Sequence, residues 1–176
     1  VASVVSTTGF GTANFNAWPM AAKALIFVLM FVGSCAGSTA GGMKTVTMLV
    51  ILLFLWSRLR GKSSVVVFHR TIGLPSVLNA LMIFGVMTGL AVFGAVVIAG
   101  TSPVSLTESL YESISAIATV GLSCGATARI SPVGKLLLIV YMYFGRVGVL
   151  TLSMGFLKGD RSEPRFRYAD ATVLIG

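Results

Sequence analysis

Residues 108–125 read ESLYESISAIATVGLSCG, with a polar start, an apolar middle and a glycine-bearing end. Ser105 and Glu108, three residues apart, form a capping-box pattern that predicts a helix beginning near Leu106. The helix can continue to about Ala118, which gives about 13 residues and about 20 Å at 1.5 Å per residue. A bilayer core of about 30 Å needs about 20 residues. We therefore expect a helix, 106–118, that enters a membrane without crossing it.

The segment that follows this helix carries the candidate function. Thr119-Val120-Gly121-Leu122 is expected to be irregular, and irregular backbone at membrane depth is tolerated only where it lines a protein-walled, water-filled path. Backbone carbonyls can replace the hydration shell of a cation, and glycine lets the chain turn them inward. The C-terminal end of a helix also favours cations. We interpret 119–125 as an ion filter, with the carbonyls of Thr119, Val120, Gly121 and Leu122 as candidate ligands.

The composition indicates an integral membrane protein. Hydrophobic residues make up 56% of the chain and charged residues 10%, against about 25% charged in soluble domains. The net charge of +8 does not indicate nucleic acid, because eight of the 13 basic residues lie in two separate segments. These are a loop at 57–74 (Arg58, Arg60, Lys62, Arg70) and a tail at 158–176 (Lys158, Arg161, Arg165, Arg167). The positive-inside rule places both in the cytoplasm.

The chain contains an internal repeat. Residues 1–10 read VASVVSTTGF, and a constant offset of 112 places Thr7 on Thr119 and Gly9 on Gly121 without a gap. The expected fold is all-α: helix–re-entrant pore loop–helix repeats of a potassium-channel-like pore, two repeats with the first truncated. The candidate ligands of the first loop, 1–17, are the carbonyls of Thr7, Thr8, Gly9 and Phe10. Because the chain begins inside a pattern already under way, we expect a piece of a longer protein without a signal peptide.

A long apolar stretch, 18–57, follows the first loop. It is interrupted at 33–42 by GSCAGSTAGG and is too long for one ordinary crossing. Such small residues favour a helix broken at membrane depth by a functional loop, although small-xxx-small packing of a continuous helix also fits. The candidate gating residues are Gly33, Ser34, Gly37, Ser38, Thr39, Gly41 and Gly42. GSTAGGMKT at 37–45 is not a phosphate-binding loop, because Met43 separates glycine from lysine and no strand precedes it.

The second repeat is expected to span 75–158, with an outer helix at 76–100 and an inner helix at 132–157. Gly85 and Gly89 would give the outer helix a close-packing face. Arg146 lies inside the apolar run of the inner helix, where it costs at least about 2.5–3.5 kcal/mol. We expect it to face a polar interior, as a cation-repelling barrier or a partner of the 33–42 carbonyls; an arginine that snorkels to an interface is the alternative.

Four motifs in order carry a resemblance to a known family. They are STTGF at 6–10, GSTAGGMKT at 37–45, ATVGLSCG at 118–125 and GRVGVLTL at 145–152. The sequence resembles the Trk/Ktr/HKT superfamily of potassium transporters over nearly its whole length, and GRVG followed by LTL favours the Ktr-type membrane subunit. The closing YADATVLIG at 168–176 is also similar to that type.

The resemblance implies specific roles. Gly9 and Gly121 match the filter glycines of the third and fourth repeats, 33–42 matches the intramembrane gating loop, and Arg146 matches the pore arginine facing it. It also implies K⁺ as substrate, Na⁺ as a candidate coupling ion in a symport, and no organic cofactor. The expected partners are a second copy of the full-length chain, the lipid bilayer and a cytoplasmic ring of nucleotide-binding regulatory subunits. The expected location is a bacterial inner membrane.

Other interpretations stay open. A secondary transporter with discontinuous helices would explain 33–42 but predicts no repeated filter glycine. An accessory subunit without a permeation path predicts that the filter glycines can be replaced freely, and a Trk-type member would share the same pore. An enzyme is not expected, because the single His69 and the absence of an intramembrane carboxylate pair leave no catalytic set. Cys35 and Cys124 have no CxxC spacing and are expected to be small apolar fillers.

Overall fold

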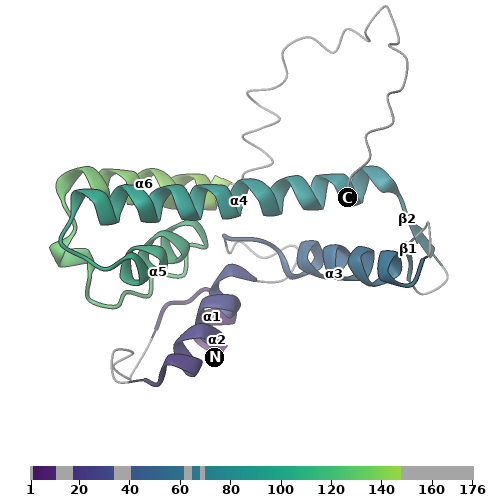
Figure 1. Ribbon diagram of the computed structural model, residues 1–176, viewed down its shortest axis with the longest axis horizontal. Coiled ribbons are helices and arrows are strands. Elements are labelled where there is room, and N and C mark those ends of the chain that lie inside the picture. Colours follow the sequence, from purple (N-terminus) through teal and green to yellow (C-terminus); the bar gives the residue numbers. More distant parts are fainter. Residues whose placement is uncertain (1, 11–17, 34–40, 62–64, 68–69, 148–176) are drawn as a thin grey trace, which may run out of the picture.

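The computed structural model describes residues 2–10, 18–33, 41–61, 65–67 and 70–147, and this part is mostly helical (Figure 1). The elements in chain order are α1 (Ala2–Val5), α2 (Met20–Phe31), α3 (Thr45–Leu59), β1 (Val65–Val67), β2 (Arg70–Ile72), α4 (Leu74–Thr101), α5 (Leu106–Ile117), the 3-10 turn η2 (Thr127–Arg129) and α6 (Pro132–Val147). The expected inner helix continues to 157, and its part beyond Val147 lies outside the described residues, as does the tail.

Helix α4 is the long element of the fold. Its 28 residues, with a mean hydropathy of 2.5 over the best window, make it the one described helix that is long and apolar enough to cross a membrane. One face is buried at Ala91, Ala95 and Ile98, whereas Val92 and Val96 are exposed. Water is a poor solvent for such a surface, and a bilayer is a suitable one. Helices α2 and α3 are apolar but shorter.

Helices α4, α5 and α6 pack together, with α6 alongside one half of α4 and the shorter α5 beside both (Figure 1). Their shared core includes Ile98, Ile117 and Leu138. The Tyr141 hydroxyl of α6 donates to the Leu90 carbonyl of α4 at 2.7 Å, which satisfies a polar group inside an apolar core. Helix α2 contacts the opposite side of α5 through the T-shaped pair of Phe27 and Tyr111.

The close-packing glycine of α4 is not one of the two predicted from spacing. In the described chain, a Cβ added to Gly85 or Gly89 would meet no atom within 4 Å. A Cβ on Gly94 would instead overlap the Tyr141 ring and lie 2.9 Å from the Ser113 hydroxyl. The prediction for Gly85 and Gly89 is therefore wrong in this structure, because glycine spacing shows which helix face is narrow but not where a partner meets it.

The segment expected as a basic loop at 57–74 includes two short strands that the all-α prediction did not anticipate. Strands β1 and β2 form an antiparallel hairpin with Val65 opposite Ile72, Val66 opposite Thr71 and Val67 opposite Arg70. The β-branched run of Val65–Val67 explains the pairing, because such side chains favour extended backbone. Lys62 and His69 lie outside the described residues.

The apolar stretch 18–57 is two helices rather than one. Helix α2 ends at Phe31 and α3 begins at Thr45, and a parallel bridge joins Val32 to Met43 across the break. A Cβ on Gly33 would lie 2.8 Å from the Gly41 carbonyl oxygen, so the two ends of the interruption touch. Residues 34–40 lie outside the described residues. A continuous helix with packing glycines does not describe this stretch.

Candidate functional site

Helix α5 directly precedes the candidate filter, and the residues before and in its first turn determine where the helix starts. The predicted capping box is present: Glu108 N donates to Ser105 Oγ at 3.2 Å, and Ser105 N donates to the Glu108 carboxylate at 3.0 Å. Arg129 adds an ion pair to Glu108 at 2.8 Å. The Ser105 backbone N–H, followed by the Arg129 side chain, holds the pKa of Glu108 below its usual value.

The backbone after α5 alternates in conformation. Thr119 has φ 52° and Gly121 has φ 81°, both in the left-handed region, while Val120 between them does not. Thr119 N donates to Ala116 O at 3.1 Å and Val120 N to Ser115 O at 3.0 Å, so the last turn of α5 anchors the loop. A β-branched residue in the left-handed region costs about 1–3 kcal/mol and persists only where its surroundings impose it.

The first loop repeats this geometry. Thr7 has φ 52° and Gly9 has φ 69°, and Thr7 and Thr119 are the only non-glycine residues with positive φ in the described chain. Thr7 N donates to Val4 O at 3.0 Å and Thr8 N to Ser3 O at 2.9 Å. At the offset of 112, these two bonds are the counterparts of the bonds from Thr119 and Val120. The sequence repeat is therefore a repeat of backbone structure.

The side chains of the second loop point away from its exposed edge. Val120 and Leu122 are 2% and 5% exposed and join an apolar cluster with Val4 of α1 and Met30 of α2. Gly121 between them is exposed, and a Cβ there would meet no atom within 4 Å. An alternation of this kind leaves backbone, rather than side chains, to line the open side of the loop.

The Leu122 carbonyl differs from its neighbours. The buried Ser115 hydroxyl donates to this oxygen at 2.6 Å, so the carbonyl is directed toward α5. Of the four carbonyls predicted as ligands in this loop, that of Leu122 thus already accepts a hydrogen bond from a side chain of the protein. In the first loop, Phe10 occupies the matching position, with a side chain that is 74% exposed.

The two loops meet. A Cβ built on Gly9 would overlap the Val120 carbonyl oxygen and lie 3.4 Å from the carbonyl carbon of Gly121. Only a residue without a side chain allows this approach, in a conformation that also favours glycine. The structure thus brings together residues of both predicted filter segments.

The end of the predicted gating segment touches the start of the second loop. Gly41 N donates to the Thr119 hydroxyl at 2.9 Å. Gly42, with φ 77°, would place a Cβ 3.2 Å from Ala118, and a Cβ on Gly41 would lie 3.0 Å from the Gly145 carbonyl oxygen. Glycines of two separate segments therefore pack closely around Ala118 and Thr119.

Arg146 directly follows Gly145, which places it beside this junction at the end of α6, with an exposed side chain. Gly145 itself packs against the Ile117 carbonyl of α5. The remaining predicted gating residues, Ser34, Gly37, Ser38 and Thr39, lie outside the described residues, as does Cys35.

The sequence alone assigns no role to Glu112. Glu112 is buried and accepts hydrogen bonds from Ser123 and Thr127, just beyond the second loop. A signal was present: Ser109, Glu112 and Ser115 recur every three residues on one side of α5, and all three are buried.

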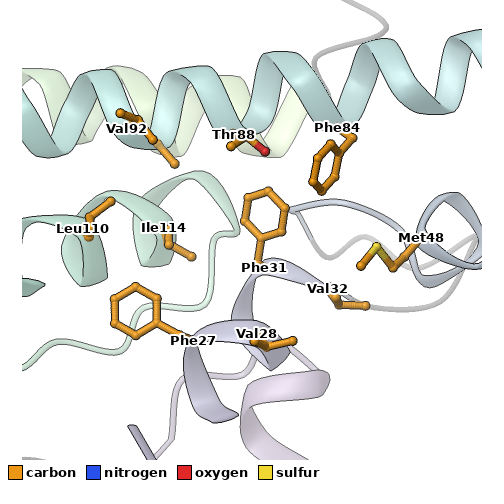
Figure 2. A pocket seen from close by; sticks show the side chains of 11 residues that line it. Phe27, Val28, Phe31, Val32, Met48, Phe84, Thr88, Val92, Leu110 and Ile114 are labelled. Carbon is orange, nitrogen blue, oxygen red and sulfur yellow. The ribbon is translucent and has the colours of Figure 1, made fainter. Parts of the chain in front are cut away.

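A separate pocket of about 360 Å³ lies between α2, α3, α4 and α5 (Figure 2). Phe31 of α2 reaches toward Phe84 of α4, with ring centroids 5.9 Å apart. The labelled lining is apolar except for the Thr88 hydroxyl, which has no hydrogen-bond partner among the described residues. A cation requires several oxygen ligands in place of its hydration shell. The labelled lining of this pocket does not provide them.

The long apolar helix α4 and the exposed apolar surface of the fold are those of a membrane protein. Residues 1–167 match the family described as TrkH, cation transport protein, and the chain belongs to this family. The Trk/Ktr superfamily predicted from the sequence is thereby confirmed.

Two relatives and one solved structure illustrate the match. The chain is 34% identical over 175 residues to the potassium/sodium uptake protein NtpJ of Enterococcus hirae, with 97% of this chain and 39% of the relative covered. It is 37% identical over 171 residues to the Ktr system potassium uptake protein B of Vibrio alginolyticus, with 97% and 37% covered. The crystal structure of the potassium transporter TrkH from Vibrio parahaemolyticus shares the fold at a TM-score of 0.69 and 24% identity, with 90% and 35% covered. The chain thus spans less than two fifths of the length of these relatives.

Proposed function

We propose that this chain supplies two of the loops of a potassium-selective filter in a membrane uptake protein. The observation that carries the proposal is the matched backbone of the two loops, in which Thr7 and Gly9 repeat the conformations of Thr119 and Gly121. Alternating left-handed residues turn successive carbonyls to one side, as a cation ligand set requires. The proposed ligands are the carbonyls of Thr7–Phe10 and Thr119–Gly121.

The prediction from the sequence includes the carbonyl of Leu122 among the cation ligands, and this proposal does not. Its carbonyl accepts a hydrogen bond from Ser115, and we assign it to anchoring the loop on α5. A ring of carbonyls around a cation needs about four loops, so the remaining two come from other parts of the full-length protein. The C-terminal end of α5, directly before Thr119, adds a partial negative charge that favours a cation.

We further propose that 33–42 gates the path below the filter, opposed by Arg146. The contacts of Gly41 with Thr119 and with the Gly145 carbonyl put the end of this segment between the filter loop and α6. A change in the position of this segment would therefore reach the filter loop through Gly41. An arginine next to it repels cations while the path is closed.

The remaining proposals follow from the relatives' printed names and the family resemblance. The relatives are a potassium/sodium uptake protein and Ktr and Trk potassium uptake proteins, so the proposed substrate is K⁺ with Na⁺ as the coupling ion. The proposed assembly is a homodimer of the full-length chain, of Ktr type, on a cytoplasmic nucleotide-binding regulatory ring. The proposed orientation in a bacterial inner membrane puts 57–74 and the C-terminus in the cytoplasm.

A secondary transporter with discontinuous helices is the second candidate, and the break between α2 and α3 favours it. The two candidates differ at Gly121. Gly121 and Gly61 have φ 81° and 70°, and a Cβ on either meets no atom within 4 Å, so serine strains both backbones alike. We expect Gly121→Ser in the full-length protein to weaken K⁺ affinity or admit Na⁺ in potassium-uptake-deficient cells, and Gly61→Ser, outside both loops, to preserve selectivity. Unchanged selectivity in Gly121→Ser would favour the second candidate.

A further inference from the structure

Glu112 is a buried carboxylate that holds the chain just beyond the filter. It is 5% exposed in the middle of α5, and both of its oxygens are hydrogen-bonded. The Ser123 hydroxyl donates to one oxygen, and the Thr127 hydroxyl donates to the other at 3.0 Å. Burying a carboxylate is costly unless such bonds compensate it, so its position is a specific feature of the site.

The Ser123 and Thr127 hydroxyls connect residues 123–127 to Glu112 in one hydrogen-bond network. Ser123 Oγ accepts from Gly125 N at 3.0 Å and lies 2.9 Å from the Thr127 hydroxyl oxygen. Each hydroxyl has one proton, and both protons are directed to Glu112. A carboxylate can accept both, whereas a glutamine side chain has one acceptor oxygen and must turn its amide group toward the other hydroxyl.

Side chains of α5 thus form hydrogen bonds with the filter segment at two successive residues. Ser115, one turn after Glu112, donates to the Leu122 carbonyl at 2.6 Å. Glu112 holds Ser123, the next residue, and Thr127 beyond it. Because Leu122 and Ser123 directly follow Gly121, these two anchors help to fix the position of its carbonyl.

We propose that Glu112 is a positioning residue for ion selection, which sets the outer end of the filter through Ser123 and Thr127. The inference rests on the proposed filter function and assigns a determinant to it. The sequence positions that match Ser123 and Thr127 in the first repeat are Gly11 and Phe15. Neither has a hydroxyl, so the sequence of the first repeat does not provide the same pair of hydroxyl groups.

The test uses the full-length protein in potassium-uptake-deficient cells, with surface amount measured in parallel. For Glu112→Gln we expect the KM for K⁺ to rise about tenfold, the order of one charge-assisted hydrogen bond, and Na⁺ to compete more strongly. The maximal rate per surface molecule should change less than about twofold, since the loop is displaced and not lost. Thr127→Val should shift KM and selectivity in the same direction, and Thr127→Ser, which keeps the hydroxyl, should restore wild-type values.

Two comparisons make the result specific. Combining Glu112→Gln with Thr127→Val should give less than the sum of the separate effects, because the residues form one network. Glu108→Gln is the matched control: it removes a carboxylate from the same helix, one turn earlier, where the partner is Arg129 instead of the loop. It should leave K⁺/Na⁺ selectivity unchanged.

The proposal is overturned if Glu112→Gln lowers only the surface amount or the maximal rate and leaves KM and K⁺/Na⁺ competition unchanged. If Glu112→Gln does not reach the surface, Thr127→Val decides by the same criteria. Failure of the filter assignment itself is distinguishable, because Gly121→Ser would then also leave selectivity unchanged. A selectivity change in Gly121→Ser with none in Glu112→Gln or Thr127→Val rejects the role of Glu112 alone.

Discussion

The backbone N–H of Gly41 donates to the side-chain hydroxyl of Thr119 at 2.9 Å. This bond joins the end of the interruption between α2 and α3 to the first loop residues after α5, across 78 positions of sequence. Thr119 also holds one of the two left-handed threonine conformations of the described chain. The proposed gate and the proposed filter are therefore in direct contact.

Removing this bond should weaken both stability and transport. Thr119→Val preserves shape but leaves the Gly41 N–H without its acceptor, which costs about 1–3 kcal/mol for a buried donor. We expect a lower unfolding temperature for the full-length protein in detergent and a changed rate of K⁺ uptake. Thr119→Ser keeps the hydroxyl and should retain wild-type stability. Equal unfolding temperatures for the valine and serine variants would show that the bond contributes nothing.

Gly9 offers a test of the contact between the two loops. Gly9→Ala should abolish K⁺ uptake, because its Cβ overlaps the Val120 carbonyl in addition to the strain of φ 69°. Gly61 is a matched control, with φ 70° and no atom within 4 Å of an added Cβ. Gly61→Ala should show only the backbone strain of about 1 kcal/mol. Comparable uptake by the two alanine variants would mean that the loops do not approach each other.

Of Gly89 and Gly94 in α4, only Gly94 should lower the stability of the protein when it is replaced by alanine. Gly94→Ala should destabilise the protein by about 1–3 kcal/mol, the range for overpacking, because the Tyr141 ring and the Ser113 hydroxyl occupy the space. Gly89→Ala should be neutral or stabilising by up to about 1 kcal/mol, since alanine is the better helix former and the space is open. Unfolding of both variants in detergent measures the difference, and the reverse order would contradict the packing of α4 on α6.

The capping box predicts a small dependence of stability on pH. The pKa of Glu108 is lowered from 4.5 by Ser105 and Arg129, so its contribution is present above the unfolded-state value and is lost as pH falls through the folded-state value. Because the side chain is partly exposed, we expect at most about 1 kcal/mol. The difference in unfolding temperature between wild type and Glu108→Gln should be constant at neutral pH and disappear on acidification. A difference that grows with falling pH would contradict this sign.

The sequence predicted those features of the site that arise locally. Ser105 and Glu108 mark the start of α5 by hydrogen bonds within four residues, and the constant offset between Thr7 and Thr119 reveals the repeat from the order of amino acids alone. The matching φ values and the matching bonds to Val4 and Ala116 agree with that repeat. Local chemistry and self-similarity can be recognised in one chain without knowledge of its packing.

The features that escaped prediction depend on which segments meet. The bond from Gly41 to Thr119 and the contact of Gly94 with Tyr141 join segments far apart in sequence. No role for Glu112 could be assigned from the sequence, because its hydrogen bonds depend on how Ser123 and Thr127 fold against α5. The hairpin at Val65–Ile72 was missed because a three-residue strand leaves too short a pattern beside a basic loop.

If the two loops line one cation site, locating a bound ion in the full-length protein will show it. Crystals of the full-length protein in Rb⁺ in place of K⁺ would give an anomalous signal at the bound cation. We expect a peak bordered by the carbonyl oxygens of the Thr7–Phe10 and Thr119–Gly121 segments, and we expect Gly121→Ser to remove or displace this peak. A peak elsewhere, with no cation near these two segments, would contradict this expectation.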